Sequence, residues 1–218
     1  MPRKQMFEGG TKNRILQVGR QLFFENGFDG TGVRAIMKAV GADVGAFYYY
    51  YTSKDELFDD VMEHFFAPFH EDFERLAKEA EETPYRSLLR FFIYLGDRTR
   101  EFRAQYAEHM HRTVRLAIRE STLTIMEPYV QRIIHILTEK GAKPIMDEKA
   151  ASVFVCHGIG SVIIHEDIDW VTSVSDELRK SINLVLGLDA DLSQKIYQDE
   201  MSRLHETEDY FWRNPSKN

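Results

Sequence analysis

Residues 12–58 read KNRILQVGRQLFFENGFDGTGVRAIMKAVGADVGAFYYYYTSKDELF, and apolar side chains recur here at helical spacing between glycine turns. The first periodic segment ends near Asn26, where Gly27 can terminate a helix in the left-handed conformation. Thr31 then offers an N-cap for a second, short helix, which Gly41 closes. The stretch therefore predicts short helices separated by tight turns.

The turn Val40-Gly41-Ala42-Asp43 joins the second predicted helix to a third, which runs from Val44 to Tyr51. Two short helices joined by a tight, glycine-containing turn are the layout of a helix-turn-helix, whose second helix enters the major groove of DNA. An ordinary helical hairpin shares this layout, so geometry alone leaves both open. The third helix carries consecutive tyrosines, Tyr48–Tyr51. Because residues turn by about 100° each around a helix, some hydroxyls must face outward, where they can donate to phosphate oxygens.

Helical periodicity continues along the rest of the chain, and strand signals are almost absent. Ser53 and Glu56 form a capping box at the start of a fourth helix that reaches towards Ala80. Pro68 should bend that helix or split it. Further helices are expected over about residues 85–119, 121–140, 147–167, 175–186 and 192–211, with Gly187 after the helix 175–186 and Asp191 capping the last.

Charge is unevenly divided along the chain. Residues 1–54 hold eight lysines and arginines against four acidic residues, a balance of +4, whereas the whole chain of 218 residues carries −7. The remaining residues therefore carry −11. A basic head on an acidic body suits a protein that presents one face to phosphate.

Cysteine content and hydropathy indicate a cytoplasmic protein. The single cysteine, Cys156, excludes an intramolecular disulfide and fits a reducing compartment. It lies in an apolar run, where a buried thiol is a simpler interpretation than a redox sensor. No segment approaches the roughly 18 apolar residues of a membrane span, and the N-terminus has no apolar signal core, so we expect no membrane partner.

The stretch 12–58 resembles the DNA-binding domain of the TetR family of transcriptional regulators over its whole length. The matching features are an I-L-x-x-x-x-x-L-F helix, the F-E-N-G-F-D-G-T turn, a V-R-x-I helix, a G-x-x-x-G-x-x-Y core and the closing S-K-D-E-L. The resemblance implies an all-α fold, with a three-helix helix-turn-helix domain over residues 1–54 and a larger helical ligand-binding and dimerisation domain over residues 55–218. It implies a homodimeric repressor that a small hydrophobic or amphipathic effector releases from a double-stranded DNA operator.

The resemblance also implies which side chains face DNA. Tyr48 and Lys54 match positions that touch phosphate, and Thr31 matches the threonine that caps the second helix beside the DNA backbone. Arg34 matches a position that can reach a base edge. The groove-facing positions of the third helix are Val44, Gly45, Ala46 and Tyr49. Because the first three of these offer no polar side chain, we expect apolar contact with thymine methyl groups.

The C-terminal helices are expected to hold the dimer and ligand sites. Helices 147–167 and 175–186 are the dimer candidates, with Val155 and Ile182 in the seam, and the alternative is that they pack only inside the monomer. The aromatic middle helices suggest an apolar ligand pocket, although each such residue could be ordinary core. The candidate ligand-binding residues are Phe91, Tyr94, Phe102, Tyr106, Met110, Tyr129, Phe154 and His157.

An enzyme and a protein–protein adaptor are the alternative classes of function. The sequence contains no G-x-S-x-G, P-loop, dinucleotide fingerprint, H-E-x-x-H or paired cysteine, so we expect no catalytic site, metal or cofactor. One E-x-x-H, Glu108 to His111, is half of the pair that a di-iron helical bundle needs. The tyrosine-rich third helix and the basic head argue against an adaptor.

Overall fold

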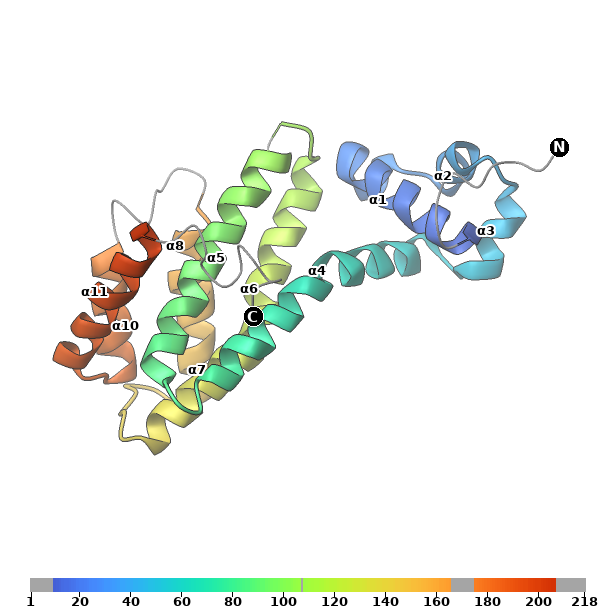
Figure 1. Ribbon diagram of the computed structural model, residues 1–218. Helices are drawn as coiled ribbons and strands as arrows, with labels where there is room; N and C mark the ends of the chain where they lie inside the picture. The colour runs from blue at the N-terminus through green and yellow to red at the C-terminus, as the bar shows by residue number, and fades with distance from the viewer. Residues whose placement is uncertain (1–9, 107, 166–174, 207–218) are drawn as a thin grey trace. The chain divides into compact units, whose positions relative to one another are not determined.

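The computed structural model describes residues 10–106, 108–165 and 175–206, and over these residues the chain is helical with no strand (Figure 1). The prediction of an all-α fold is therefore confirmed. In chain order the elements are α1 (Gly10–Gly30), α2 (Val33–Val40), α3 (Val44–Tyr50), α4 (Lys54–Glu79), α5 (Pro84–Tyr106), α6 (Arg112–Glu139), α7 (Glu148–Val153), the π-helical η1 (Phe154–Gly160), α8 (Ser161–Ile163), α10 (Ser175–Leu186) and α11 (Ala190–Glu206). None of the described helices combines the length and low charge that a membrane crossing requires.

The chain divides into two compact units. The first comprises Met1–Pro68 and Gln105–Glu120, and the second comprises Phe69–Ala104 and Ser121–Asn218. The first unit thus includes the beginning of α4 and the junction between α5 and α6, both of which lie beyond the expected domain boundary at residue 54. Neither Pro68 in α4 nor Pro128 in α6 ends its helix.

One apolar core joins α1, α2, α3 and the beginning of α4 in the first unit. Helices α1 and α4 approach closely at Gly19, because a Cβ there would lie 2.9 Å from Cδ2 of Leu57. The side chains that this core buries completely are Ile15, Phe23, Ile36, Met37, Phe47, Leu57 and Val61. Burial of these groups supplies most of the driving force that orients the short helices, which are too short to be stable alone.

The end of α1 is built by Gly27 and Thr31. Gly27 has φ 76° and ψ 172°, which interrupts the helix and leaves carbonyl groups without helical partners. The Thr31 hydroxyl lies 2.9 Å from the oxygen of Leu22 and 2.8 Å from that of Gly27, and it donates to these carbonyls. The prediction that Thr31 caps α2 is therefore wrong. Gly32 occupies the N-cap and makes no side-chain bond.

The prediction of one helix over residues 85–119 is also wrong, because α5 ends at Tyr106 and α6 begins at Arg112. At this junction the backbone N–H of His111 donates to the oxygen of Phe24 in α1, at 2.6 Å. The imidazole lies against Gly27, where an added Cβ would be 2.5 Å from Nδ1. A contact with a distant helix thus accompanies the break, and local periodicity does not reveal it.

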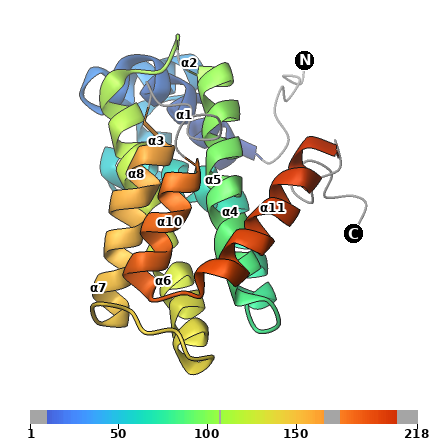
Figure 2. The ribbon, with the colours of Figure 1, turned by 90° about the vertical axis from the view of Figure 1, so that its left-hand side faces the viewer.

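The second unit packs its helices around an aromatic cluster. The ring of Phe73 stacks on that of Phe91, with centroids 4.6 Å apart. Figure 2 shows α10 alongside the α7–η1–α8 segment, and both η1 and α11 contact α10. Val155 is completely buried in this core, so it presents no side chain to a dimer seam, whereas Ile182 is partly buried against the core.

Helix ends in the second unit follow the sequence closely, with one exception. Asp147 accepts a hydrogen bond from the backbone of Ala150 at 3.0 Å, as expected for the helix that begins there. The bounds of α10 agree with the prediction, and Gly187 follows it with φ 60°. The expected cap of α11 is wrong, because Asp189 and not Asp191 accepts from the backbone of Leu192. Residues 207–211 and 166–167 of the expected helices lie outside the described residues.

A buried carboxylate attaches α11 to α5. The side chain of Glu200 is fully buried and accepts from Arg86 at 2.8 Å and from Nε of Arg90 at 2.9 Å. Arg86 also donates to Asp199, and Arg90 also donates to Glu79. A buried carboxylate is tolerated when charged donors of this kind surround it.

Candidate nucleic-acid interface

The turn between α2 and α3 is closed by backbone geometry that requires glycine. Gly41 has φ 75° and ψ 37°, the left-handed conformation, and its N–H donates to the oxygen of Met37 at 2.9 Å. The oxygen of Val40 accepts from Nη2 of Arg14 in α1, at 2.7 Å. The carbonyls at the end of α2 are thus satisfied, and α3 starts in a defined direction.

One face of helix α3 packs in the core, and the other face is exposed to solvent. Phe47 and Tyr51 are buried, and the Tyr51 hydroxyl donates to Asp60 at 2.7 Å. Burial and the neighbouring Asp60 carboxylate raise the pKa of Tyr51, which therefore stays a neutral donor. Tyr48 and Tyr49 are 59% and 81% exposed. The expectation that the consecutive tyrosines point in different directions is confirmed.

The first turn of α3 presents an apolar surface of low relief. Val44 and Gly45 are exposed, Ala46 is half-buried, and a Cβ added at Gly45 would meet no atom within 4 Å. Asp43 holds the N-cap position, but its side chain makes no capping hydrogen bond. With small side chains and no neighbour above them, these residues allow a ligand surface to approach the backbone closely.

Basic side chains flank this surface. Arg34 and Lys38 are exposed on α2 and are four residues apart, so they share one helix face. Sequence reasoning missed Lys38, although its spacing from Arg34 is a visible signal. Nζ of Lys54 donates to the oxygen of Phe28 at 2.8 Å and lies 4.0 Å from the centre of its ring. Because an ammonium has three donors, Lys54 can still donate to an anion from this fixed position.

Thr31 does not belong to the exposed surface. Its side chain is 1% exposed, and its hydroxyl is engaged by the carbonyls of α1. The expected contact between this side chain and the DNA backbone is incompatible with such burial. Thr31 instead shapes the end of α1 that precedes the helix-turn-helix.

The candidate ligand-binding residues are divided between the two units. Phe91, Tyr94 and Tyr129 gather round the ring of Phe73, with centroid distances of 4.6, 5.6 and 5.6 Å, and form ordinary core. The Tyr94 hydroxyl donates to Asp72 at 2.7 Å. Of the remaining five, three belong to the second unit and two to the first. In the second unit, Phe102 is half-buried and Phe154 is 48% exposed. Nε2 of His157 lies 2.7 Å from a carboxylate oxygen of Glu127. In the first unit, Tyr106 and Met110 line a groove of about 480 Å³ beside α1.

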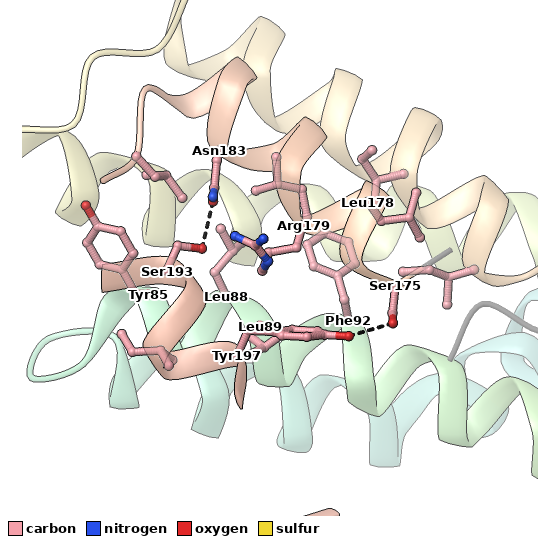
Figure 3. A pocket seen from close by; sticks show the side chains of 15 residues that line it. Tyr85, Leu88, Leu89, Phe92, Ser175, Leu178, Arg179, Asn183, Ser193 and Tyr197 are labelled. Atoms are coloured by element: carbon pink, nitrogen blue, oxygen red, sulfur yellow. Dashed lines mark hydrogen bonds between the residues drawn. The ribbon is translucent and has the colours of Figure 1, made fainter. Parts of the chain in front are cut away.

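A different set of side chains lines a partly open cavity in the second unit. The cavity has a volume of about 50 Å³ and lies between α5, η1–α8, α10 and α11 (Figure 3). None of the eight candidate residues lines it. Sequence reasoning missed its walls because no signal in the sequence indicates that α11 folds back towards α5.

The structure holds little for catalytic chemistry in the residues that it describes. Cys156 is buried, and burial raises the pKa of its thiol, so the reactive thiolate is disfavoured. No group of three or more histidine, cysteine or acidic side chains in the described ranges is arranged to hold a metal ion.

Comparison with known proteins bears on the first unit and on the fold. Residues 15–61 match the family described as bacterial regulatory proteins, tetR family. The HTH-type transcriptional repressor NemR of Escherichia coli is 30% identical over 74 residues, which are 34% of this chain and 37% of NemR. The matched segment thus spans little more than a third of that relative.

Solved structures extend the similarity to the C-terminal helices. The match to RolR in complex with resorcinol covers 85% of this chain and 92% of the RolR chain, with a TM-score of 0.53 and 20% sequence identity. The SmeT–triclosan complex covers 82% and 91%, with a TM-score of 0.54 and 17% identity. At these identities the likeness concerns the fold.

Proposed function

We propose that this chain, whose residues 15–61 match the tetR family of bacterial regulatory proteins, is a transcriptional repressor that a small molecule releases from its DNA operator. The main support for the proposal is that α3 has one buried face and one exposed face. Phe47 and Tyr51 anchor the helix, while Tyr48, Tyr49 and the small residues before them face outward. Such a regulator acts in the cytoplasm, where bacterial DNA lies.

Contacts with DNA divide into positioning and base recognition. Tyr48, Lys54 and Lys38 supply hydroxyl and ammonium donors to phosphate, which fixes the position of the domain without regard to sequence. Arg34 supplies a fork of donors that suits the O6 and N7 acceptors of guanine. Val44 supplies an apolar surface for a thymine methyl group. Tyr49, the most exposed of the tyrosines, extends the same face.

We propose a homodimer that uses α10 and the α7–η1–α8 segment. Large apolar side chains remain exposed there, namely Leu184 at 72%, Phe154 at 48% and Val153 at 38%. Exposed apolar groups of this size favour an interface, because covering them removes apolar area from water. A two-fold dimer presents two α3 helices to two half-sites.

A small effector completes the proposal. RolR and SmeT, which share the fold, have been solved with resorcinol and with triclosan. Both molecules are phenols that combine an aromatic ring with at least one hydroxyl group, which supports a hydrophobic or amphipathic effector here. Ligand and operator then oppose each other reciprocally, typically by about 1–3 kcal/mol.

The test is selection of bound sequences from random DNA with the full chain, followed by a salt titration on the selected site. We expect a two-fold symmetric motif and an affinity that falls linearly on a log–log plot as salt rises. The double variant Tyr48→Ala, Lys38→Ala removes two positioning groups and should reduce the salt slope by about one. Lys78→Ala, a loss of charge at the end of α4, is the matched control. Failure to enrich any sequence, with wild-type chain folded, would contradict the proposal.

A further inference from the structure

The cavity beneath α11 has apolar walls and a small polar end. Leu88 and Phe92 of α5 form one wall, and Ile182 of α10 and Ile196 of α11 form others. A cavity needs about 10–15 Å³ to hold one water, so its volume of about 50 Å³ holds roughly three to five groups of that size. This space suits a short hydrocarbon segment.

Arg179 places a charged donor group at this cavity. Its side chain is 9% exposed, and Nε and Nη2 donate to one carboxylate oxygen of Asp176 at 3.1 and 2.7 Å. The guanidinium lies 5.5 Å from the ring centre of Tyr197. A guanidinium has five N–H donors, and no other described residue accepts from Arg179. It therefore retains donors for another acceptor.

Asn183 supplies a second donor one helical turn further along α10. It is 9% exposed, and its Oδ1 accepts from the hydroxyl of Ser193 at 2.8 Å. No acceptor for its Nδ2 amide lies among the described residues. Residues four apart on a helix share a face, and Figure 3 shows Arg179 and Asn183 directed towards α11. An oxygen of a bound molecule that meets both groups would therefore accept from donors that the described residues leave available, which is stabilising.

The charge at this end of the cavity is positive. Asp176 is shared between Arg179 and Lys180, so two cations face one carboxylate. The carboxylate is also the more exposed member of the Asp176–Arg179 pair. An anion that approaches Arg179 therefore meets a net positive charge in a partly desolvated setting, where its attraction is stronger than in water.

We propose that this cavity binds a short amphipathic carboxylate, with its hydrocarbon end between Phe92 and Ile182 and its oxygens on Arg179 and Asn183. The inference rests on the proposed function, because it names the class of molecule that acts as effector. Such a molecule touches α5, α10 and α11 together, so it stabilises the attachment of α11.

Calorimetric titration of the full chain tests the site. The probes are butyrate and its uncharged isostere butyramide. We expect butyrate to bind at least about tenfold more tightly, because only its charged oxygens complement Arg179. Arg179→Gln should remove that preference and Arg179→Lys should keep part of it. Lys195→Gln, an equal loss of charge on α11 at an exposed position outside the cavity, should leave it unchanged.

Two results would overturn the proposal. The first is equal affinity of the wild-type chain for butyrate and butyramide, or no binding of either. This result would overturn the proposal whether or not the variants fold. Equal loss of affinity in Arg179→Gln and Lys195→Gln would also do so.

Operator affinity is measured separately, with and without butyrate. Selective butyrate binding that leaves operator affinity unchanged upholds the cavity site and rejects release by this ligand. Operator binding without any butyrate site rejects the cavity inference and leaves the DNA-binding function standing.

Discussion

Replacing Gly27 by alanine should harm the first unit more than any other added methyl group at a glycine on α1. Its backbone, at φ 76° and ψ 172°, lies in a region that essentially only glycine occupies, and strain there costs about 1–3 kcal/mol. The added Cβ would lie 2.5 Å from Nδ1 of His111, so the imidazole must turn away. That movement breaks its 2.8 Å hydrogen bond with the hydroxyl of Thr113, worth about 0.5–1.5 kcal/mol. We expect Gly27→Ala to lower the free energy of unfolding by about 2–4 kcal/mol.

Two further variants separate strain from the clash. Gly41→Ala also meets a positive φ, 75°, but a Cβ there has no atom within 4 Å, so it should cost only the left-handed strain of about 1–2 kcal/mol. His111→Ala introduced into Gly27→Ala removes the imidazole that the methyl group displaces. Measured against His111→Ala alone, Gly27→Ala should therefore cost about 1 kcal/mol less than it does in the wild-type chain, and only the strain should remain.

Urea unfolding followed by circular dichroism measures each free energy. A cost for Gly27→Ala no larger than that of Gly41→Ala would refute the argument that the imidazole contact adds to the strain. An unchanged cost after His111→Ala would refute it independently, because the double variant has no ring left to displace.

Three other sets of variants test the DNA interface, the dimer and the attachment of α11. Arg34→Ala should relax the base preference at one position in each half-site, at a cost of about 1–3 kcal/mol in binding free energy, whereas Tyr48→Phe should weaken binding to all sequences alike. Selection from random DNA that returns an unchanged motif for Arg34→Ala would contradict base recognition by this residue. Leu184→Glu places a charge on the most exposed large apolar side chain of α10 and should yield monomers in light scattering, and an unchanged dimer rejects this seam. Glu200→Ala leaves arginines without their buried carboxylate and should cost about 3 kcal/mol in unfolding free energy, against less than about 1 kcal/mol for the more exposed Asp199→Ala. Equal costs for these two would show that burial of the carboxylate does not matter.

The helix-turn-helix can be predicted from the sequence because the residues that determine it lie close together along the chain. Gly41 is needed where the backbone adopts positive φ, and the apolar spacing around Phe47 sets which side of α3 is buried. The bounds of α10 follow for the same reason, since Gly187 ends the helix through its own conformation. Steric limits on a single residue and the period of a helix act within a few positions, so they can be inferred without knowledge of the fold.

Contacts between distant segments account for what the sequence does not predict. The break before α6 coincides with the hydrogen bond from the backbone N–H of His111 to the oxygen of Phe24. The hydroxyl of Thr31 donates to α1 because Gly27 leaves carbonyl groups there without helical partners. Of the candidate ligand-binding residues, Phe91, Tyr94 and Tyr129 instead pack in the core around Phe73. The cavity at Arg179 exists because α11 folds back and is held to α5 by buried charge. Burial and charge pairing depend on which surfaces meet, and helical periodicity along one segment carries no information about its partner.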